Sequence, residues 1–80
     1  MVKDLYNTDS PYWCWVKEEM LGQVSNRLNR IGDYELAEKY QPDIFSFTQE
    51  DVMQCTDIND LPADWRKLAD ACIEKYKIKP

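Results

Sequence analysis

The clearest helical pattern in this chain is LPADWRKLADACIEKY, residues 61–76. At about 100° per residue, its apolar side chains fall within one sector of a helix, which is typical of an amphipathic helix packed on a core. These side chains are Leu61, Trp65, Leu68, Ala69, Cys72, Ile73 and Tyr76. Pro62 suits the first turn of a helix, where its missing N–H removes no hydrogen bond. The pattern predicts a helix over residues 62–77.

A second amphipathic stretch precedes it and predicts a helix over residues 11–30. Asp9 or Ser10 can cap its start, Pro11 fits the first turn, and Gly32 can end it in the left-handed conformation. The apolar stripe comprises Trp13, Val16, Met20, Leu21, Val24, Leu28 and Ile31. Lys17 falls within the same arc, so we expect it to snorkel or to lie at the edge of the buried face.

The segment between these helices predicts two short helices over residues 34–40 and 49–55. Asp33 can cap the first, and Thr48 followed by Asp51 resembles a capping signal for the second. The connection between them contains the apolar side chains of Ile44, Phe45 and Phe47. We expect these side chains to lie against the core, since they would otherwise be in water. The alternative for Phe45 and Phe47 is that they are anchors of an interface with a partner.

The sequence therefore predicts an all-α fold, a small compact bundle of about four helices. Residues 1–80 form a single domain with a loose N-terminal arm over residues 1–8. No apolar run reaches the length of about 20 residues that a membrane span needs, and the N-terminus lacks the pattern of a signal peptide. We expect a cytoplasmic protein that binds no membrane.

Charge is distributed unevenly along the chain. Residues 33–64 contain nine carboxylates and one base, Lys39, which gives this segment a net charge of −8 against −5 for the whole chain. Concentrated charge of one sign steers association and rejects like-charged surfaces. The acids of Glu50 and Asp51 would repel phosphates, so we expect no direct nucleic acid binding through the acidic face. A basic protein surface is the expected partner.

The residues of common catalytic and metal sites are largely missing. The chain has no histidine and only two glycines, which argues against the usual general bases, His-dependent nucleophiles and phosphate-binding loops. Cys14, Cys55 and Cys72 are odd in number and widely spaced, which fits neither a disulfide framework nor a zinc site. We expect no enzyme activity, no cofactor and no metal.

The candidate contact residues are acids of the middle segment together with two aromatic residues near the start of the first helix. They are Glu35, Glu38, Asp43, Glu50, Asp51, Asp57, Tyr12 and Trp15. Trp15 lies about 200° around a regular helix from Trp13 and so points away from the core. The alternative is that the N-terminal arm folds over Trp15 or that the first turn of this helix is irregular.

These observations favour a non-catalytic protein-binding module, an inhibitor or adaptor that engages a basic and nucleic-acid-handling protein by presenting carboxylates in place of phosphates. Small acidic helical proteins are common among phage and mobile-element inhibitors, which is an analogy of class only. One alternative is a structural subunit that forms a homodimer or another helical oligomer through its exposed aromatic residues. A small enzyme would need a concave site with perturbed carboxylates.

Overall fold

The computed structural model describes residues 10–79, and this part of the chain is entirely helical apart from its connections. The elements are α1 (Pro11–Asn29), α2 (Glu35–Tyr40), α3 (Gln49–Gln54), the short 3₁₀ helix η2 (Ile58–Asp60) and α4 (Ala63–Tyr76). The all-α fold class is confirmed, with each α-helix beginning and ending within one residue of its predicted bounds. The predicted N-terminal arm lies outside the described residues.

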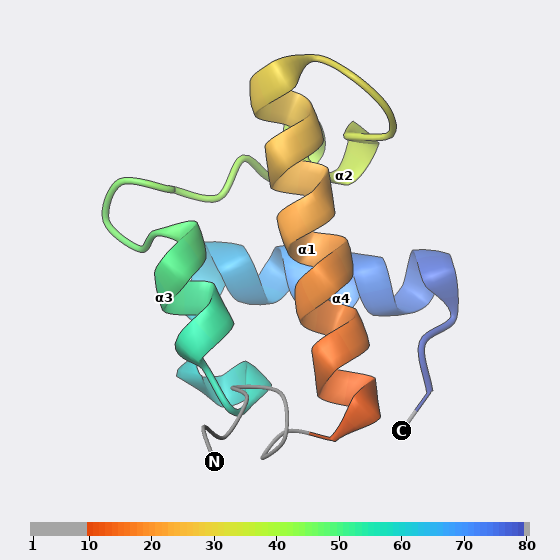
Figure 1. Cartoon of the computed structure of the whole chain (residues 1–80), viewed down its shortest axis with the longest axis vertical. Helices are drawn as coiled ribbons and strands as arrows, with labels where there is room; N and C mark the ends of the chain where they lie inside the picture. Colours follow the sequence, from red (N-terminus) through yellow and green to blue (C-terminus); the bar gives the residue numbers. More distant parts are fainter. Residues whose placement is uncertain (1–9, 80) are drawn as a thin grey trace, which may run out of the picture.

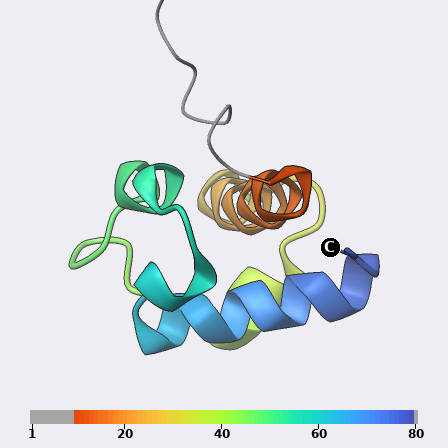
Figure 2. The same ribbon diagram turned by 90° about the horizontal axis from the view of Figure 1, so that it is seen from below.

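The two long helices cross each other, and the short helices fill in beside them (Figure 1). Seen along the other axis, α1 and α3 form one layer while α4, α2 and η2 form the second (Figure 2). The acidic helices α2 and α3 lie apart in both views. The middle segment therefore contributes α3 to one layer and α2 and η2 to the other.

The core forms where α1 crosses α4. Its largest apolar side chains come from the two predicted stripes: Trp13, Val16, Met20, Val24, Trp65, Leu68, Ala69 and Cys72. Ala37 of α2 and Val52 of α3 complete it from the two sides. The prediction was wrong for Leu28 and Ile31, which are 53% and 63% exposed. The end of α1 extends beyond its crossing with α4 (Figure 1), so the stripe continues where no helix covers it.

Lys17 is buried, contrary to the prediction that it would snorkel or lie at an edge. Its side chain is 0% exposed, and its ammonium donates hydrogen bonds to the carbonyl oxygens of Met53 (3.0 Å) and Cys55 (2.9 Å). These carbonyls lie at the C-terminal end of α3, where the helix dipole favours a cation. The Trp13 indole N–H donates to the same Cys55 oxygen at 2.8 Å. Together the two side chains fasten α1 to the end of α3.

The helix caps agree in part with those predicted from the sequence. The Ser10 hydroxyl accepts a hydrogen bond from the Trp13 N–H at 3.1 Å, and Thr48 and Asp51 form the predicted capping box. The C-cap of α1 is Arg30, at φ 56°, rather than Gly32, which adopts φ 66° in the following turn. Asp33 is not the N-cap of α2, although its Oδ1 accepts from the Glu35 N–H at 3.3 Å.

The side chain of Gln23, in α1, accepts hydrogen bonds from the first turn of α2 instead. Its Oε1 accepts hydrogen bonds from the N–H groups of Leu36 (3.0 Å) and Ala37 (3.1 Å). Its Nε2 donates to the Tyr76 hydroxyl at 2.9 Å. The first turn of a helix leaves its N–H groups without intrahelical partners, so a buried amide that accepts two of them stabilises α2 and links it to both long helices.

Candidate functional site

The connection between α2 and α3 presents one aromatic ring to solvent. Phe45 is 90% exposed, which is the largest exposure among the large hydrophobic residues of the described chain. Ile44 and Phe47, on either side of it, are partly buried against the core, as predicted. The prediction that Phe45 also packs on the core was wrong, because the loop turns its side chain outward between two neighbours that point inward.

The Asp43 carboxylate fixes the backbone of this loop. Its Oδ1 accepts hydrogen bonds from the N–H groups of Phe45 (2.8 Å) and Ser46 (3.1 Å), and its Oδ2 accepts from the Ser46 hydroxyl (2.8 Å). The N–H groups of Ser46 and Phe45 and the Ser46 hydroxyl lower the pKa of Asp43. A local side-chain turn of this kind replaces helix or sheet hydrogen bonds in connections. Phe45 therefore projects from a defined backbone conformation.

Helix α4 anchors both sides of the same loop. The Trp65 indole N–H points at the carbonyl oxygens of Asp43 (3.3 Å) and Phe47 (3.1 Å), and the Trp65 and Phe47 rings meet edge to face at 6.5 Å. The Asp64 Oδ2 accepts a hydrogen bond from the Asp43 N–H at 2.6 Å. Because Trp65 is fully buried, the loop that carries the exposed Phe45 is attached directly to the core.

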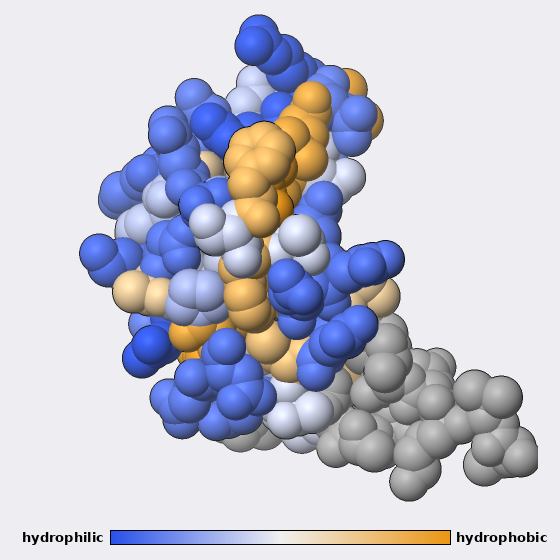
Figure 3. All heavy atoms as spheres, turned by 90° about the vertical axis from the view of Figure 1, so that its left-hand side faces the viewer, coloured by the Kyte–Doolittle hydropathy of each residue, from blue (hydrophilic) through white to orange (hydrophobic). Residues whose placement is uncertain are grey.

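The face that carries this loop and α3 has a band of apolar atoms between hydrophilic margins (Figure 3). Exposed apolar surface of this kind, bordered by polar groups, is typical of sites of protein interaction. We call the exposed part of residues 43–47, with Phe45 at its tip, the Phe45 loop.

The predicted contact acids do not form one continuous surface. Three of them serve the fold: Glu38 pairs with Arg27 at 2.8 Å, Asp43 holds the Phe45 loop, and Asp51 belongs to the capping box of α3. Asp57 accepts a hydrogen bond from Asn59 at 3.0 Å. The other two predicted contact acids are Glu35 on α2 and Glu50 on α3. Their side chains are exposed and form no hydrogen bond or ion pair within residues 10–79.

The two predicted contact aromatics differ in burial. Tyr12 is partly buried against the core, whereas Trp15 is 44% exposed. The regular geometry of α1 explains the outward direction of Trp15, as predicted from its position. Coverage of Trp15 by residues 1–8 lies outside the described residues. The structure brings neither aromatic residue into the Phe45 loop.

A charged cluster forms at Asp33, in the connection between α1 and α2. Its Oδ2 accepts hydrogen bonds from the Lys75 ammonium (2.5 Å) and the Tyr76 hydroxyl (3.0 Å). The Lys75 hydrogen bond is the main reason that the pKa of Asp33 falls to about 2, and the Glu35 N–H and the Tyr76 hydroxyl add to it. Burial raises the pKa of the Tyr76 hydroxyl. The cluster ties the turn after α1 to the end of α4.

This lowered pKa predicts a loss of stability in acid. The ordinary pKa of 3.8 applies in the unfolded chain, so ionised Asp33 stabilises the fold above about pH 4, and this contribution disappears as the pH falls towards 2. Because the pair is exposed, we expect it to contribute at most about 1 kcal/mol. Urea unfolding should show Asp33→Asn less stable than the natural chain at pH 6 and equally stable near pH 2. A difference that does not change with pH would contradict the role of this carboxylate.

Neither buried cysteine has the environment of a nucleophile. Burial raises the pKa of Cys72 to about 12 and also raises the pKa of Cys55. A thiol must ionise to attack or to bind metal, so both environments disfavour that chemistry. Within residues 10–79, no group of three or more Cys, Asp and Glu side chains is arranged to hold a metal ion. The helices of this same region include none that is long and apolar enough to cross a membrane.

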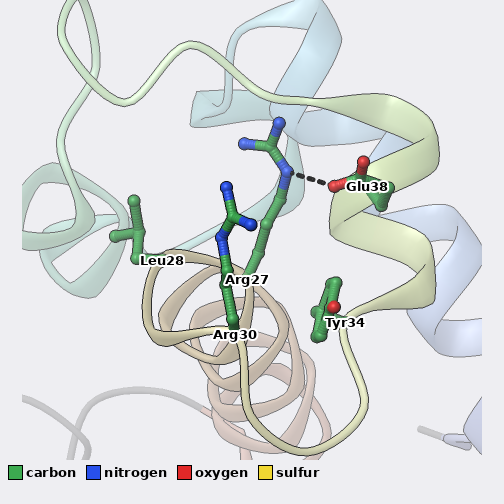
Figure 4. A pocket seen from close by; sticks show the side chains of 5 residues that line it. All are labelled: Arg27, Leu28, Arg30, Tyr34 and Glu38. Carbon is green, nitrogen blue, oxygen red and sulfur yellow. Dashed lines mark hydrogen bonds and ion pairs between the residues drawn. The ribbon is translucent and has the colours of Figure 1, made fainter.

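A hollow of about 390 Å³ lies between the end of α1 and the start of α2. Its lining consists of Arg27, Leu28, Arg30, Tyr34 and Glu38 (Figure 4). Sequence reasoning missed this site. The available signal was the spacing of Arg27 and Arg30, which puts two cations on one side of the last turn of a helix.

No known family model, curated protein or solved structure matches this chain. Functional inference therefore rests on residues 10–79 themselves, above all on the Phe45 loop and the hollow at the end of α1.

Proposed function

We propose that this chain is a non-catalytic protein-binding module that inserts Phe45 into an apolar pocket of a basic partner. The observation that carries the proposal is the nearly complete exposure of an aromatic ring on a loop that Asp43 and Trp65 hold in place. Burying a phenylalanine side chain releases about 1.5–3 kcal/mol, so a partner that covers this ring gains affinity from it. A pre-formed loop loses little conformational entropy on binding.

The acidic residues around Phe45 support a partner pocket with a basic border. The Asp43 carboxylate lies at the base of Phe45, and the acidic first turn of α3, with Glu50 and Asp51, follows the loop directly. Opposite charge at the rim of an interface accelerates association and excludes acidic competitors. The contact set proposed from the structure differs from the predicted one. Phe45, which the predicted set does not include, lies at the centre, and Asp43, Glu50 and Asp51 lie around it.

Within this proposal, the chain acts as an inhibitor or adaptor of a nucleic-acid-handling protein. A basic groove that normally holds phosphates offers the cationic border that these carboxylates complement. The apolar contacts of Phe45 then contribute affinity that moderate salt does not reduce. The carboxylates contribute electrostatic affinity that salt weakens. The ionic-strength dependence of affinity separates the two contributions.

The test is the change Phe45→Ser. We expect the stability of the chain to change by no more than about 0.5 kcal/mol, because the ring is 90% exposed. The affinity for the partner should fall about 30-fold to 1,000-fold, as for a central interface residue. The measurement is capture from a native host extract, followed by calorimetry with the purified partner. Ile31→Ser, which alters an exposed apolar residue at the end of α1, is the matched control and should bind normally.

Charge reversal provides the second arm of that experiment. Glu50→Lys should weaken binding at low salt and have less effect as the salt concentration rises, while the helical content stays unchanged. The proposal fails if the same partner is captured equally by the natural chain, Phe45→Ser and Glu50→Lys.

Assembly through exposed apolar residues is the second candidate function. Four large hydrophobic residues of the described chain are between 44% and 90% exposed, which favours contact with another helical chain or a second copy. They are Trp15, Leu28, Ile31 and Phe45. Light scattering over a range of concentrations distinguishes the two proposals. A self-associating chain that Phe45→Ser turns into a monomer supports assembly, whereas a monomer at all concentrations leaves the partner-binding proposal.

A further inference from the structure

The hollow at the end of α1 contains more hydrogen-bond donors than its surroundings use. The only ion pair in it joins Arg27 Nε to Glu38 Oε2 at 2.8 Å, which leaves both terminal nitrogens of Arg27 available. Within residues 10–79, the Arg30 guanidinium and the Tyr34 hydroxyl form no hydrogen bond or ion pair. The one carboxylate of the lining is already shared with Arg27.

Both arginine side chains turn towards the same opening. Figure 4 shows their guanidinium groups side by side, with Leu28 on one side and Tyr34 and Glu38 on the other. The C-terminal dipole of α1 explains a cation in its last turn. It does not explain two neighbouring guanidinium groups when the one carboxylate of the lining pairs with Arg27 alone, because like charges repel at short range. An anion in the opening removes that repulsion.

We propose that this hollow binds a phosphate monoester. A phosphate carries a charge of about −1.5 to −2 at pH 7 and three acceptor oxygens, so it can accept from both guanidinium groups and from a hydroxyl at once. A carboxylate has two oxygens and one charge, which matches one planar guanidinium rather than two. The volume of about 390 Å³, open to solvent, accommodates the phosphate together with part of the group that carries it. Leu28 gives that group an apolar contact.

The site is independent of the Phe45 loop. Its residues come from the end of α1 and from α2, whereas residues 43–47 follow α2 and are fixed by α4. The phosphate can belong to a small molecule or to a phosphorylated side chain of a protein, since the lining recognises the phosphate in both. Phenyl phosphate and a short phosphoserine peptide represent the two sources.

Calorimetry and the NMR signals of the arginine Nε–H groups test the proposal on the full chain. We expect phenyl phosphate to shift the signals of Arg27 and Arg30, and Arg30→Gln to weaken binding about tenfold to a hundredfold, which corresponds to the loss of a charge-assisted hydrogen bond. Gln41 already adopts a positive φ in this chain, so glutamine is compatible with the backbone at position 30. Lys67→Gln, which removes an exposed cation from α4, is the matched control and should not change the affinity.

Glu38→Gln should change the affinity for phosphate in the opposite direction to Arg30→Gln. Removing the one negative charge from the lining should strengthen phosphate binding several-fold, an effect that general attraction to surface cations does not produce at this position alone. Tighter binding of the phosphoserine peptide than of phenyl phosphate identifies a protein side chain as the source, and the reverse order identifies a small molecule. The proposal is overturned if benzoate binds as tightly as phenyl phosphate, if Arg30→Gln and Lys67→Gln have equal effects, or if no probe binds.

Discussion

Replacing Trp65 with alanine is expected to remove most of the stability of this domain. Trp65 is fully buried where α4 meets α1 and the Phe45 loop, and truncating such a ring costs about 3–5 kcal/mol. A domain of 80 residues has only about 4–12 kcal/mol in total. Chemical denaturation at 25 °C should therefore show that Trp65→Ala has a free energy of unfolding about 3–5 kcal/mol lower than that of the natural chain. A loss of less than about 1 kcal/mol would contradict the central place of this ring in the core.

Trp65→Phe separates the ring from its N–H group. Phenylalanine keeps much of the apolar packing but cannot donate to the carbonyl oxygens of Asp43 and Phe47. We expect a stable fold with a loss of about 1–2 kcal/mol and faster amide exchange at Phe45 and Ser46. Because the Phe45 loop would be less ordered, partner binding should also weaken. Unchanged exchange at these two amides would show that the Asp43 carboxylate holds the loop alone.

The fold could be predicted because each long helix has a sequence pattern that packing satisfies. Ser10 and Pro11 mark the start of α1, the Thr48 and Asp51 pair marks the start of α3, and two apolar stripes meet in one core. These signals are local, since they depend on residues one to four positions apart. They gave the helix class and bounds without any knowledge of how the helices pack.

The remaining features depend on which segments meet. Helical periodicity puts Leu28 and Ile31 on the buried stripe, but α1 extends beyond α4 at that end. Lys17 looked like an edge residue because its partners, two carbonyl groups at the end of α3, are more than 35 residues away along the chain. The outward direction of the Phe45 side chain likewise depends on the hydrogen bonds of Asp43 and Trp65. A hydropathy pattern does not predict these hydrogen bonds.

Charge alone predicts little of the site for the same reason. The middle segment concentrates carboxylates in the sequence, yet the fold spreads them over α2, α3, η2, the start of α4 and the connections between these helices. The two short helices α2 and α3 themselves lie apart. Several then become structural: Asp33 holds Lys75, Glu38 holds Arg27, and Asp43 shapes the Phe45 loop. A net charge summed over a segment overestimates the charge available to a partner when the acids already have partners of their own.

Gln23→Leu is expected to cause the second large loss of stability, about 2–4 kcal/mol. Leucine has a similar size but no polar atoms, so the N–H groups of Leu36 and Ala37 lose their acceptor at the start of α2. Ala37 is completely buried, so water does not readily replace the lost partner, and an unpaired buried N–H costs about 1–3 kcal/mol. The Tyr76 hydroxyl also loses its donor.

Two further variants assign that loss to the helix start. Tyr76→Phe removes only the side-chain contact with Gln23 and Asp33 and should cost about 1 kcal/mol. Gln23→Glu keeps an acceptor for both N–H groups at the positive end of α2 and should be more stable than Gln23→Leu. Amide exchange at Leu36 and Ala37 should accelerate in Gln23→Leu alone. If Gln23→Leu and Tyr76→Phe lose equal stability, the two N–H groups contribute nothing, and α2 is held to the bundle by its apolar side chains.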